Sequence, residues 1–375
     1  MTPHLAAKRA RLMAGWAVQS AANRSKPSIA ITDVSADAVR EPAGKREYVI
    51  VTLRTDSGPT GIGETAVAPG ADVAAVVATI LDQKKALVGR DPTAVETLPA
   101  SPVRGAFNMA CLDIAGKLAK APVYEVLGGP TRFKARAATT LSSDGAVSSL
   151  RAAGFRAALV PLPAPPYRNQ GQAWVKGVRR RLEQLRQAAG DDFDFILDCD
   201  GALTPGDAQM LAKELETFHL LWLEEPCSLV NLQAAAKISA ESVTPVGFGR
   251  HVTQNHQFQD LLRLDAIDIL RPPLRLGLTP IRKAAALAET YYTAVAPFHR
   301  GGPVATAAAL HLAACLPNFF LQEVPFPAAE QDRRMRAELI STPVESVLDG
   351  YFHLPTGPGL GITLNPDALQ KYRAA

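Results

Sequence analysis

The sequence has few cysteines, and it arranges none of them in a recognisable pair. Its 375 residues include only four, Cys111, Cys199, Cys227 and Cys315, which are scattered along the chain. Zinc sites and disulfide frameworks use cysteines at short, repeated spacings. The sequence therefore gives no support to a zinc site or a disulfide-stabilised fold, and buried free thiols are expected.

Long apolar runs and an excess of one charge are also missing. No stretch approaches the roughly 18 apolar residues that span a bilayer, so no membrane partner is expected. The 40 basic and 36 acidic residues give a net charge of +4, which is too balanced to indicate a nucleic-acid-binding protein. A mildly basic site for an anionic ligand is compatible with this charge. We expect a cytoplasmic protein without nucleic-acid partners.

The first residues differ from the rest of the chain. Lys8, Arg9 and Arg11 precede a short mixed segment that faintly resembles a bacterial export leader but lacks a strong apolar centre. Residues 1–27 are therefore interpreted as an N-terminal extension, and an exported, cleaved form stays a weaker alternative. The remaining length suits two or three domains, or an α/β barrel that runs long as one unit.

Three short apolar runs in the middle of the chain each end in a charged residue. The runs FDFILDCDG, LLWLEEP and TPVGFGR carry Asp198, Glu224 and Arg250, and each of these lies 26 positions after the one before. A strand, a helix and two loops fill about that length, so each interval fits one βα unit of a parallel sheet. Closure of such units into a barrel brings the strand ends to one mouth, where barrels build their sites.

These strand ends resemble the metal-ligand triad of the enolase superfamily, in its mandelate racemase and muconate lactonizing branch. VTLRTDSGPTGIGE, ACLDIAGKLAKAPVYEVLGG and DGYFHLPTGPGLGI resemble the capping domain of that branch, and APFHRGGPVATAAALHLAACLPNFFLQE resembles a segment of galactonate- and mannonate-type acid-sugar dehydratases. The resemblance covers nearly the whole chain beyond the extension. It implies an α/β fold: a TIM-type (β/α) barrel with an N-terminal α+β capping domain that the C-terminal tail completes.

The chain is accordingly divided into four parts. Residues 1–27 are the extension, 28–132 the cap, 133–344 the barrel and 345–375 a tail that packs on the cap. In the cap, the β-branched and aromatic run Tyr48–Leu53 predicts a strand, and helices are expected over 73–88 and 104–118. Eight buried parallel strands are expected in the barrel, at Ala137–Leu141, Ala157–Pro161, Phe195–Asp198, Leu221–Glu224, Val246–Gly249, Ile267–Leu270, Thr293–Ala296 and Phe319–Gln322.

The resemblance implies a Mg²⁺ cofactor, which binds a substrate carboxylate and stabilises the enediolate formed when a base removes the α-proton. Asp198 and Glu224 match two metal ligands, but Arg250 stands at the third position, where the branch normally has an acidic residue. A guanidinium cannot coordinate a metal. At ~4 Å and an effective dielectric of about 20, its attraction to each carboxylate is roughly 4 kcal/mol. Arg250 is therefore expected to replace the metal with a salt bridge; alternatively, it turns to solvent and Asp200 becomes the third ligand.

The residues that supply the base in the resembled enzymes are also changed. The second-strand segment GFRAALVP lacks their Lys-x-Lys pattern, and Pro273 replaces the sixth-strand Asp that orients a seventh-strand His. Phe298 falls at the position of that His, with His299 one residue later. His299 and Asp200 are the candidate catalytic residues. The alternative for His299 is a structural histidine, and the alternative for Asp200 is a simple ion pair with an arginine.

Glu323, at the end of the eighth strand, matches a site glutamate of the resembled enzymes, while Arg250, Arg271 and Arg300 suit a carboxylate or sugar hydroxyls. The leading hypothesis is a family member whose activity is lost or altered. One alternative is an active Mg²⁺-dependent sugar-acid dehydratase that uses Asp200 and His299. The other is a metal-free carboxylate-binding or structural pseudoenzyme. A small carboxylate or acid-sugar ligand and association into a homo-oligomer are expected.

Overall fold

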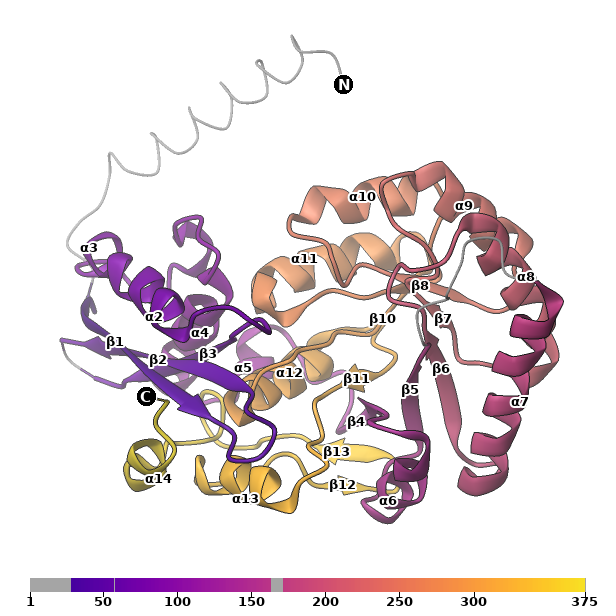
Figure 1. Cartoon of the computed structure of the whole chain (residues 1–375). Coiled ribbons are helices and arrows are strands. Elements are labelled where there is room, and N and C mark those ends of the chain that lie inside the picture. The colour runs from indigo at the N-terminus through magenta and orange to yellow at the C-terminus, as the bar shows by residue number, and fades with distance from the viewer. Residues whose placement is uncertain (1–27, 57, 163–170, 375) are drawn as a thin grey trace, which may run out of the picture.

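The computed structural model describes residues 28–56, 58–162 and 171–374, so the extension predicted at residues 1–27 lies outside the described part. Two bodies lie side by side, a small sheet with its helices and a larger barrel (Figure 1). None of the helices in the described part has the length and apolar character needed to cross a membrane. All four cysteines are free and buried.

The smaller body is the predicted cap. Its antiparallel sheet runs in the order β1 (Ile31–Arg40), β2 (Glu47–Thr55) and β3 (Gly61–Ala66), so the strand predicted at Tyr48–Leu53 lies inside β2. The sheet approaches its longest helix so closely that a Cβ at Gly61 or Gly63 would lie 2.1 or 2.0 Å from a helix carbonyl oxygen. Only glycine fits there. The cap helices are α2 (Val73–Asp82), α3 (Lys84–Leu87), α4 (Arg104–Ala119) and α5 (Val123–Val126).

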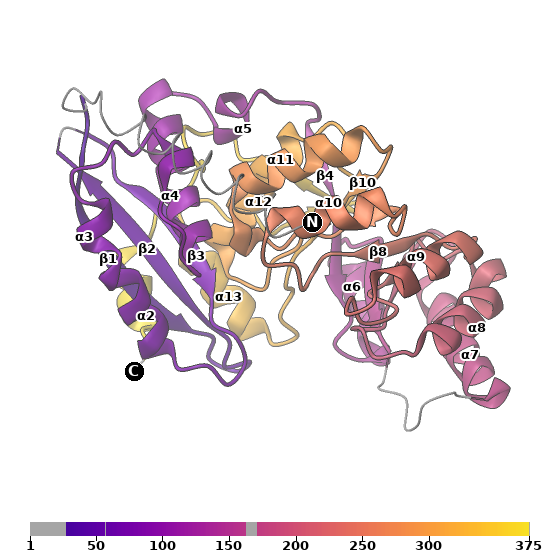
Figure 2. The ribbon, with the colours of Figure 1, turned by 90° about the horizontal axis from the view of Figure 1, so that it is seen from above.

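Apolar side chains of α2, α3 and α4 form one core with β1 and β2, and Figure 2 shows these helices beside the sheet. The helix predicted over 73–88 is divided into α2 and α3 at Gln83. The helix predicted over 104–118 is α4, which is buried on nearly all sides because it lies between the cap sheet and the barrel.

The larger body is a parallel barrel, as predicted. Its strands are β4 (Lys134–Thr140), β5 (Ala157–Pro161), β6 (Asp194–Asp198), β7 (Leu223–Glu224), β8 (Val246–Phe248), β9 (Ile269–Leu270), β10 (Ala294–Val295) and β11 (Gln322–Glu323). From β4 to β10 each strand pairs with the next, and β11 pairs with β4. Isolated bridges from Val295 to Phe319 and from Phe298 to Glu323 complete the ring between β10 and β11. The last strand starts later than predicted, because only a single bridge at Phe319 joins the preceding residues to β10.

Helices alternate with the strands and cover the outside of the barrel. In α7 the buried residues Val175, Val178, Leu182 and Leu185 recur every three or four positions, which places them on one face of the helix. The barrel helices are α6 (Val147–Ala152), α7 (Gln172–Ala189), α8 (Pro205–Leu215), α9 (Leu232–Glu241), α10 (Asn255–Arg263), α11 (Leu278–Glu289) and α12 (Pro303–Cys315). Short 3₁₀ turns are η1 (Val95–Thr97), η2 (Asp144–Ala146), η3 (Glu216–Phe218) and η4 (Leu274–Leu276).

The C-terminal part contacts both bodies. After α13 (Glu330–Glu338), the hairpin of β12 (Val347–Leu348) and β13 (Tyr351–His353) pairs antiparallel with β4 and so extends the barrel sheet. The chain then reaches the cap, where α14 (Pro366–Lys371) precedes a bridge between Arg373 and Val39 of β1. The tail was predicted to pack on the cap. In the structure its first elements belong to the barrel sheet, since backbone pairing with β4 begins at Tyr351.

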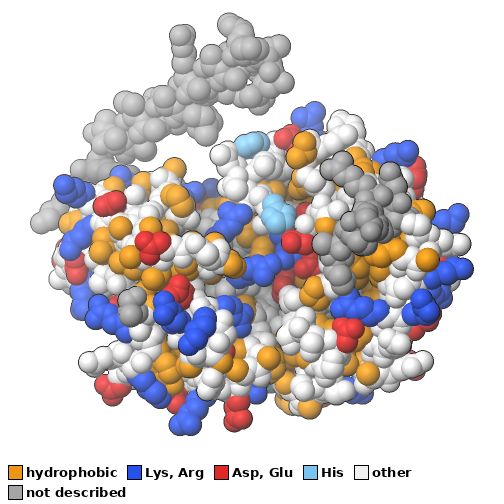
Figure 3. Space-filling view, viewed as in Figure 1, with side chains coloured by type: hydrophobic (Ala, Val, Ile, Leu, Met, Phe, Trp, Pro, Cys, Tyr) orange, Lys and Arg blue, Asp and Glu red, His pale blue; other side chains and the backbone are white. Residues whose placement is uncertain are grey.

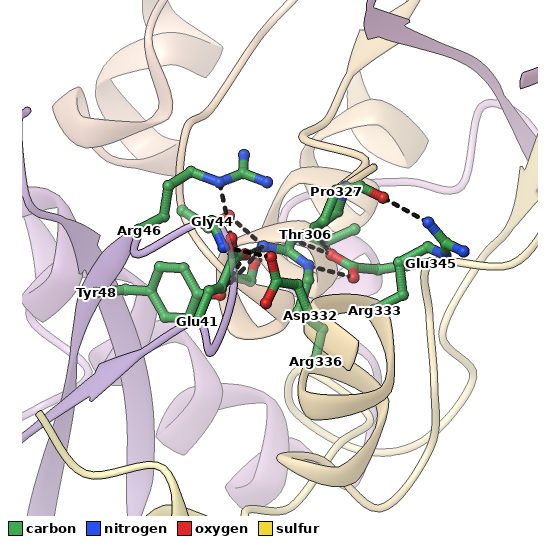
Figure 4. A network of polar contacts seen from close by, with 12 residues as sticks. Glu41, Gly44, Arg46, Tyr48, Thr306, Pro327, Asp332, Arg333, Arg336 and Glu345 are labelled. Carbon is green, nitrogen blue, oxygen red and sulfur yellow. Dashed lines mark hydrogen bonds and ion pairs between the residues drawn. The ribbon is translucent and has the colours of Figure 1, made fainter. Parts of the chain in front are cut away.

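A buried polar network joins the cap to the barrel. Arg336 of α13 donates hydrogen bonds to Glu345 and to Glu41, which also accepts from Tyr48 of β2 (Figure 4). One turn away on the same helix, Asp332 accepts from the backbone N–H groups of Ala43 and Gly44, each at 2.7 Å. The segment that joins β1 to β2 is therefore fixed to α13 through both its backbone and its side chains.

Candidate active site

The carboxyl ends of five barrel strands bring charged side chains together at one mouth. Space-filling atoms show basic and acidic side chains meeting in the hollow between the cap and the barrel (Figure 3). The residues that make up the buried cluster are Asp198 at the end of β6, Glu224 at the end of β7, Arg250 after β8, Arg271 after β9 and Glu323 at the end of β11. The 26-residue intervals correctly predicted that the first three would be neighbours.

Arg250 points into the barrel and lies between the two predicted metal ligands. Its Nη1 donates to Oδ2 of Asp198 at 2.6 Å, and its Nε lies 3.6 Å from Oε1 of Glu224. Only 3% of its side chain is exposed. The backbone that aims it is fixed by Glu225, whose Oε1 accepts from the N–H groups of Gly249 at 2.9 Å and Arg250 at 2.7 Å. The guanidinium therefore does not turn to solvent.

Arg271 lies deeper in the barrel and connects two more carboxylates. Its Nε donates to both oxygens of Glu224, at 3.0 and 2.8 Å, and its Nη2 donates to Glu323. The indole Nε1 of Trp222 donates to Oε2 of Glu224 at 2.5 Å. Burial raises the pKa of Glu224 to about 7 even though Arg271 and Arg250 favour its charged form. Burial alone would raise the pKa of Glu323 as well, but the same arginines outweigh it and hold that pKa below its usual value.

Phe298 covers the two guanidinium groups. The guanidinium carbon of Arg250 lies 5.4 Å from the ring centroid, and that of Arg271 lies 5.5 Å from it. Aromatic faces attract cations at such distances. The position at which the resembled dehydratases have a histidine is therefore occupied here by a ring that stabilises two buried arginines.

The residues at this mouth do not fit Mg²⁺. That ion takes an octahedron of hard oxygen ligands at short distances, whereas Asp198 and Glu224 here converge on a guanidinium, which has only donors. Glu224 is further occupied by Arg271 and Trp222. Over the described residues, no group of three or more His, Cys, Asp or Glu side chains is arranged to hold a metal.

Asp200, a predicted catalytic residue and alternative ligand, does not join the cluster. Its side chain is 68% exposed, and Oδ1 lies 3.5 Å from Nε2 of His251 on the surface. The prediction assumed an extended chain beyond Asp198, in which alternate residues share a side. The backbone instead takes a left-handed conformation at Asp200, with φ of 47°, and turns its carboxylate outward. The backbone N–H of Asp200 still donates to Asp198 at 3.1 Å.

His299, the other predicted catalytic residue, is buried and has both ring nitrogens engaged. Its Nδ1 accepts from the N–H of Gly301 at 3.2 Å, and its Nε2 lies 3.3 Å from Oγ1 of Thr306. Thr306 donates its single hydroxyl proton to Glu345 at 2.5 Å, and Glu345 is paired with Arg336 (Figure 4). The proton of the neutral ring must then be on Nε2, and the one remaining lone pair is used by Gly301. In this arrangement His299 offers no free base to the barrel mouth.

Because His299 is buried, acid should destabilise the protein through it. Burial, with smaller contributions from Arg336 and Arg46, lowers the pKa of His299 to about 3. An unfolded histidine binds its proton near pH 6.5. Stability from the neutral ring is therefore present above pH 6.5 and is lost as the pH falls towards 3, by up to about 1.4 kcal/mol per pH unit.

The measurement is the thermal midpoint between pH 7 and pH 4 for the wild type and for His299→Gln, with the surface variant His256→Gln as control. We expect a shallower pH dependence for His299→Gln and an unchanged one for the control. Parallel curves for all three proteins would contradict a buried, neutral His299.

Arg300, a predicted substrate-binding residue, is exposed in the loop that precedes α12, near enough to Glu323 to favour its charged form. Sequence reasoning did not identify Trp222 or Glu225 as parts of the site, and it placed Phe298 at the position of the catalytic histidine without giving it a role. The adjacent pair Glu224-Glu225 was a usable signal, since a second acidic residue at a strand end needs a partner when buried. The cation–aromatic contacts of Phe298 had no signal in the sequence.

Comparison with known proteins identifies the two bodies. Residues 144–368 match the family model described as "Enolase C-terminal domain-like", and residues 34–128 match that of the mandelate racemase / muconate lactonizing enzyme N-terminal domain. D-xylonate dehydratase of Haloferax volcanii is 28% identical over 91% of this chain and 88% of its own length. D-galactonate dehydratase of Ralstonia pickettii is 29% identical over 85% of this chain and 89% of its own length.

Solved structures agree with these matches. A mandelate racemase/muconate lactonizing enzyme from Jannaschia sp. CCS1 superposes with a TM-score of 0.80 and 28% identity, over 92% of this chain and 98% of that one. Another from Sulfitobacter sp. gives a TM-score of 0.81 and 26% identity, over 92% and 96%. The likeness extends over both bodies, and the chain therefore belongs to the mandelate racemase and muconate lactonizing enzyme branch of the enolase superfamily.

Proposed function

We propose that this chain binds a small carboxylate of the acid-sugar class at its barrel mouth, and that it does not carry out the metal-assisted proton abstraction of its relatives. The observation that supports this most directly is the guanidinium of Arg250 seated between Asp198 and Glu224. Mg²⁺ is the usual cofactor of the family, and its chemistry needs a cation that can accept substrate oxygens as ligands. A guanidinium can only donate hydrogen bonds to them.

The two candidate bases support the same proposal, because neither is available at the barrel mouth. A general base must reach the proton it removes, but His299 uses both nitrogens in internal contacts and Asp200 faces the surface. The lost ligand and the lost bases lie on different strands, so no single local change accounts for them. Fold alone does not restore the missing groups.

Arg250 is the group that we assign to the ligand's carboxylate. Its Nη1 is used by Asp198 and its Nε faces Glu224, while its Nη2 has no hydrogen-bond partner among the described residues. The planar guanidinium donates to carboxylates with good geometry. The acid-sugar class is proposed because D-xylonate and D-galactonate dehydratases resemble the chain over most of their length.

The test is thermal stabilisation by D-galactonate and D-xylonate, in EDTA and in Mg²⁺, with D-galactose and D-xylose as controls that lack the carboxylate. We expect stabilisation by an acid but not by its sugar, equal with and without Mg²⁺, and worth about 2.7 kcal/mol when the ligand is 100-fold above its Kd. Arg250→Gln should lose most of this stabilisation, while the surface variant Arg263→Gln should keep it.

The second candidate function, an active dehydratase that uses Asp200 and His299, is favoured by the names of the relatives. Dehydration of an aldonate gives a 2-keto acid, which can be assayed in the same samples. Mg²⁺-dependent formation of that product by the wild type, lost in His299→Gln, would replace our proposal with this alternative.

A further inference from the structure

The charges at the barrel mouth alternate along a single chain of contacts. Asp198 meets Arg250, Arg250 faces Glu224, Glu224 meets Arg271, and Arg271 meets Glu323. These five side chains come from the ends of five strands, and all have side-chain exposures below 10%. We call these residues the guanidinium ladder.

The ladder balances carboxylates that otherwise would need a cation. Asp198 and Glu224 are side by side at the ends of paired strands, where Cα partners match Asp198 with Glu224. Two buried carboxylates this close repel each other unless a positive charge lies between them. Arg250 supplies that charge, and its pKa is raised above its ordinary value because Glu323, Asp198 and Glu224 together outweigh the opposing effect of burial.

The surroundings are shaped to hold arginine at this place. The ring of Phe298 lies over both guanidinium groups, and the ring centroid of Trp222 lies 5.2 Å from the guanidinium carbon of Arg271. Glu225 fixes the backbone N–H of Arg250 and thereby the direction of its side chain. The backbone held by Glu225, the ring of Phe298 and the carboxylates of Asp198 and Glu224 therefore all favour a guanidinium that points into the barrel.

We infer that Arg250 is a built-in counter-ion that masks a divalent-cation site, and that one substitution is enough to open it. Replacing the guanidinium by a carboxylate leaves Asp198, Glu224 and the new side chain as three oxygen donors around one place, the donor set that a hard divalent cation prefers. Glu224 keeps its contacts with Arg271 and Trp222, and the second lone pair of its Oε1, the oxygen that faces Arg250 at 3.6 Å, is the one available to the cation. This inference deepens the proposed function, on which it rests, since it explains how the mouth remains charge-balanced without a metal.

The test is calorimetric titration of metal-free protein with MgCl₂ and MnCl₂, using the wild type, Arg250→Glu, Arg250→Gln and Arg300→Glu. The last is a matched control, because it makes the same change of charge at an exposed residue of the same mouth. We expect one site in Arg250→Glu that binds either cation at least about 100-fold more tightly than the wild type or Arg300→Glu. Arg250→Gln, which removes the cation without adding a ligand, should remain weak.

Thermal unfolding keeps the inference testable if Arg250→Glu is only marginally stable. Its midpoint should be low in EDTA and should rise with MnCl₂, while the midpoint of the wild type should be the same in both. Tight 1:1 cation binding by the wild type would overturn the inference, as would a folded Arg250→Glu with no cation response in either measurement. Neither readout uses an acid sugar, so failure of the ligand experiment on the wild type remains a separate result.

Discussion

Replacing Arg271 by methionine is expected to destabilise the protein by about 3–5 kcal/mol, the usual cost of removing one partner from a buried ion pair. Arg271 is fully buried and is the only residue of the guanidinium ladder that contacts both Glu224 and Glu323. Its loss leaves two carboxylates without their nearest cation. For a protein of this length, the thermal midpoint should fall by about 5 °C.

The pH dependence of that loss identifies its cause. Glu224 already has a pKa raised to about 7 by burial, and it can become neutral when its partner is removed. Arg271 lowers that pKa, so its removal raises it further, and the deficit of Arg271→Met relative to the wild type should be largest at alkaline pH and shrink as the pH falls towards 7. Below 7 this carboxyl is neutral in both proteins and adds no further change. The exposed variant Arg300→Met is the control and should be close to the wild type throughout. A deficit that does not change with pH would indicate lost packing rather than lost charge.

Replacing Arg336 by methionine is expected to cost a similar amount, about 3–5 kcal/mol, and to loosen the cap from the barrel. Arg336 is 1% exposed and binds Glu345, Glu41 and the carbonyl oxygen of Gly301. It thus joins the cap, the barrel mouth and the tail at one point. Thermal unfolding measures the loss of stability, and hydrogen exchange of residues 41–48 measures the loosening.

Arg334 provides a control on the same helix. Its side chain is 76% exposed and pairs only with Glu338 among the described residues, four positions along α13. Surface pairs of this kind contribute about 0.3–0.5 kcal/mol. Arg334→Met should therefore leave both readouts nearly unchanged. If Arg336→Met unfolds like the wild type and its 41–48 segment exchanges no faster, the network in Figure 4 does not hold the cap in place.

Much of the fold was predictable because local patterns and chain length constrain it strongly. Short apolar runs at regular intervals predicted the barrel strands, and the helices of the cap were found at nearly their observed positions. The sequence did not show which part of the C-terminal tail joins the barrel sheet and which part packs on the cap. Two-residue strands such as β12 carry too little sequence pattern to show which sheet they join. β12 joins the barrel sheet through β13, which pairs with β4.

The candidate site was predictable in position but not in side-chain direction. Asp198, Glu224 and Arg250 were placed together correctly because equal βα intervals bring strand ends to one mouth. Asp200 was chosen because alternate residues of an extended chain share a side, and His299 because it lies one residue after the histidine position of the resembled dehydratases. In the structure Asp200 faces solvent, and His299 is turned into the network of Thr306 and Glu345. Backbone conformation beyond a strand end is irregular, so alternation of side chains no longer applies there.

The sequence by itself determined the family, the barrel with its cap, and the substitution of an arginine for an acidic residue at the mouth. The family and the replaced ligand follow from segments that resemble known enzymes, and the barrel strands follow from regularly spaced apolar runs; neither needs coordinates. Only the tertiary structure decided that Arg250 lies inward on Asp198, that Arg271 and Phe298 complete its surroundings, and that His299 is held as a neutral, fully bonded ring. The reason is that burial and hydrogen-bond partners come from segments far apart in the chain, which only folding brings together.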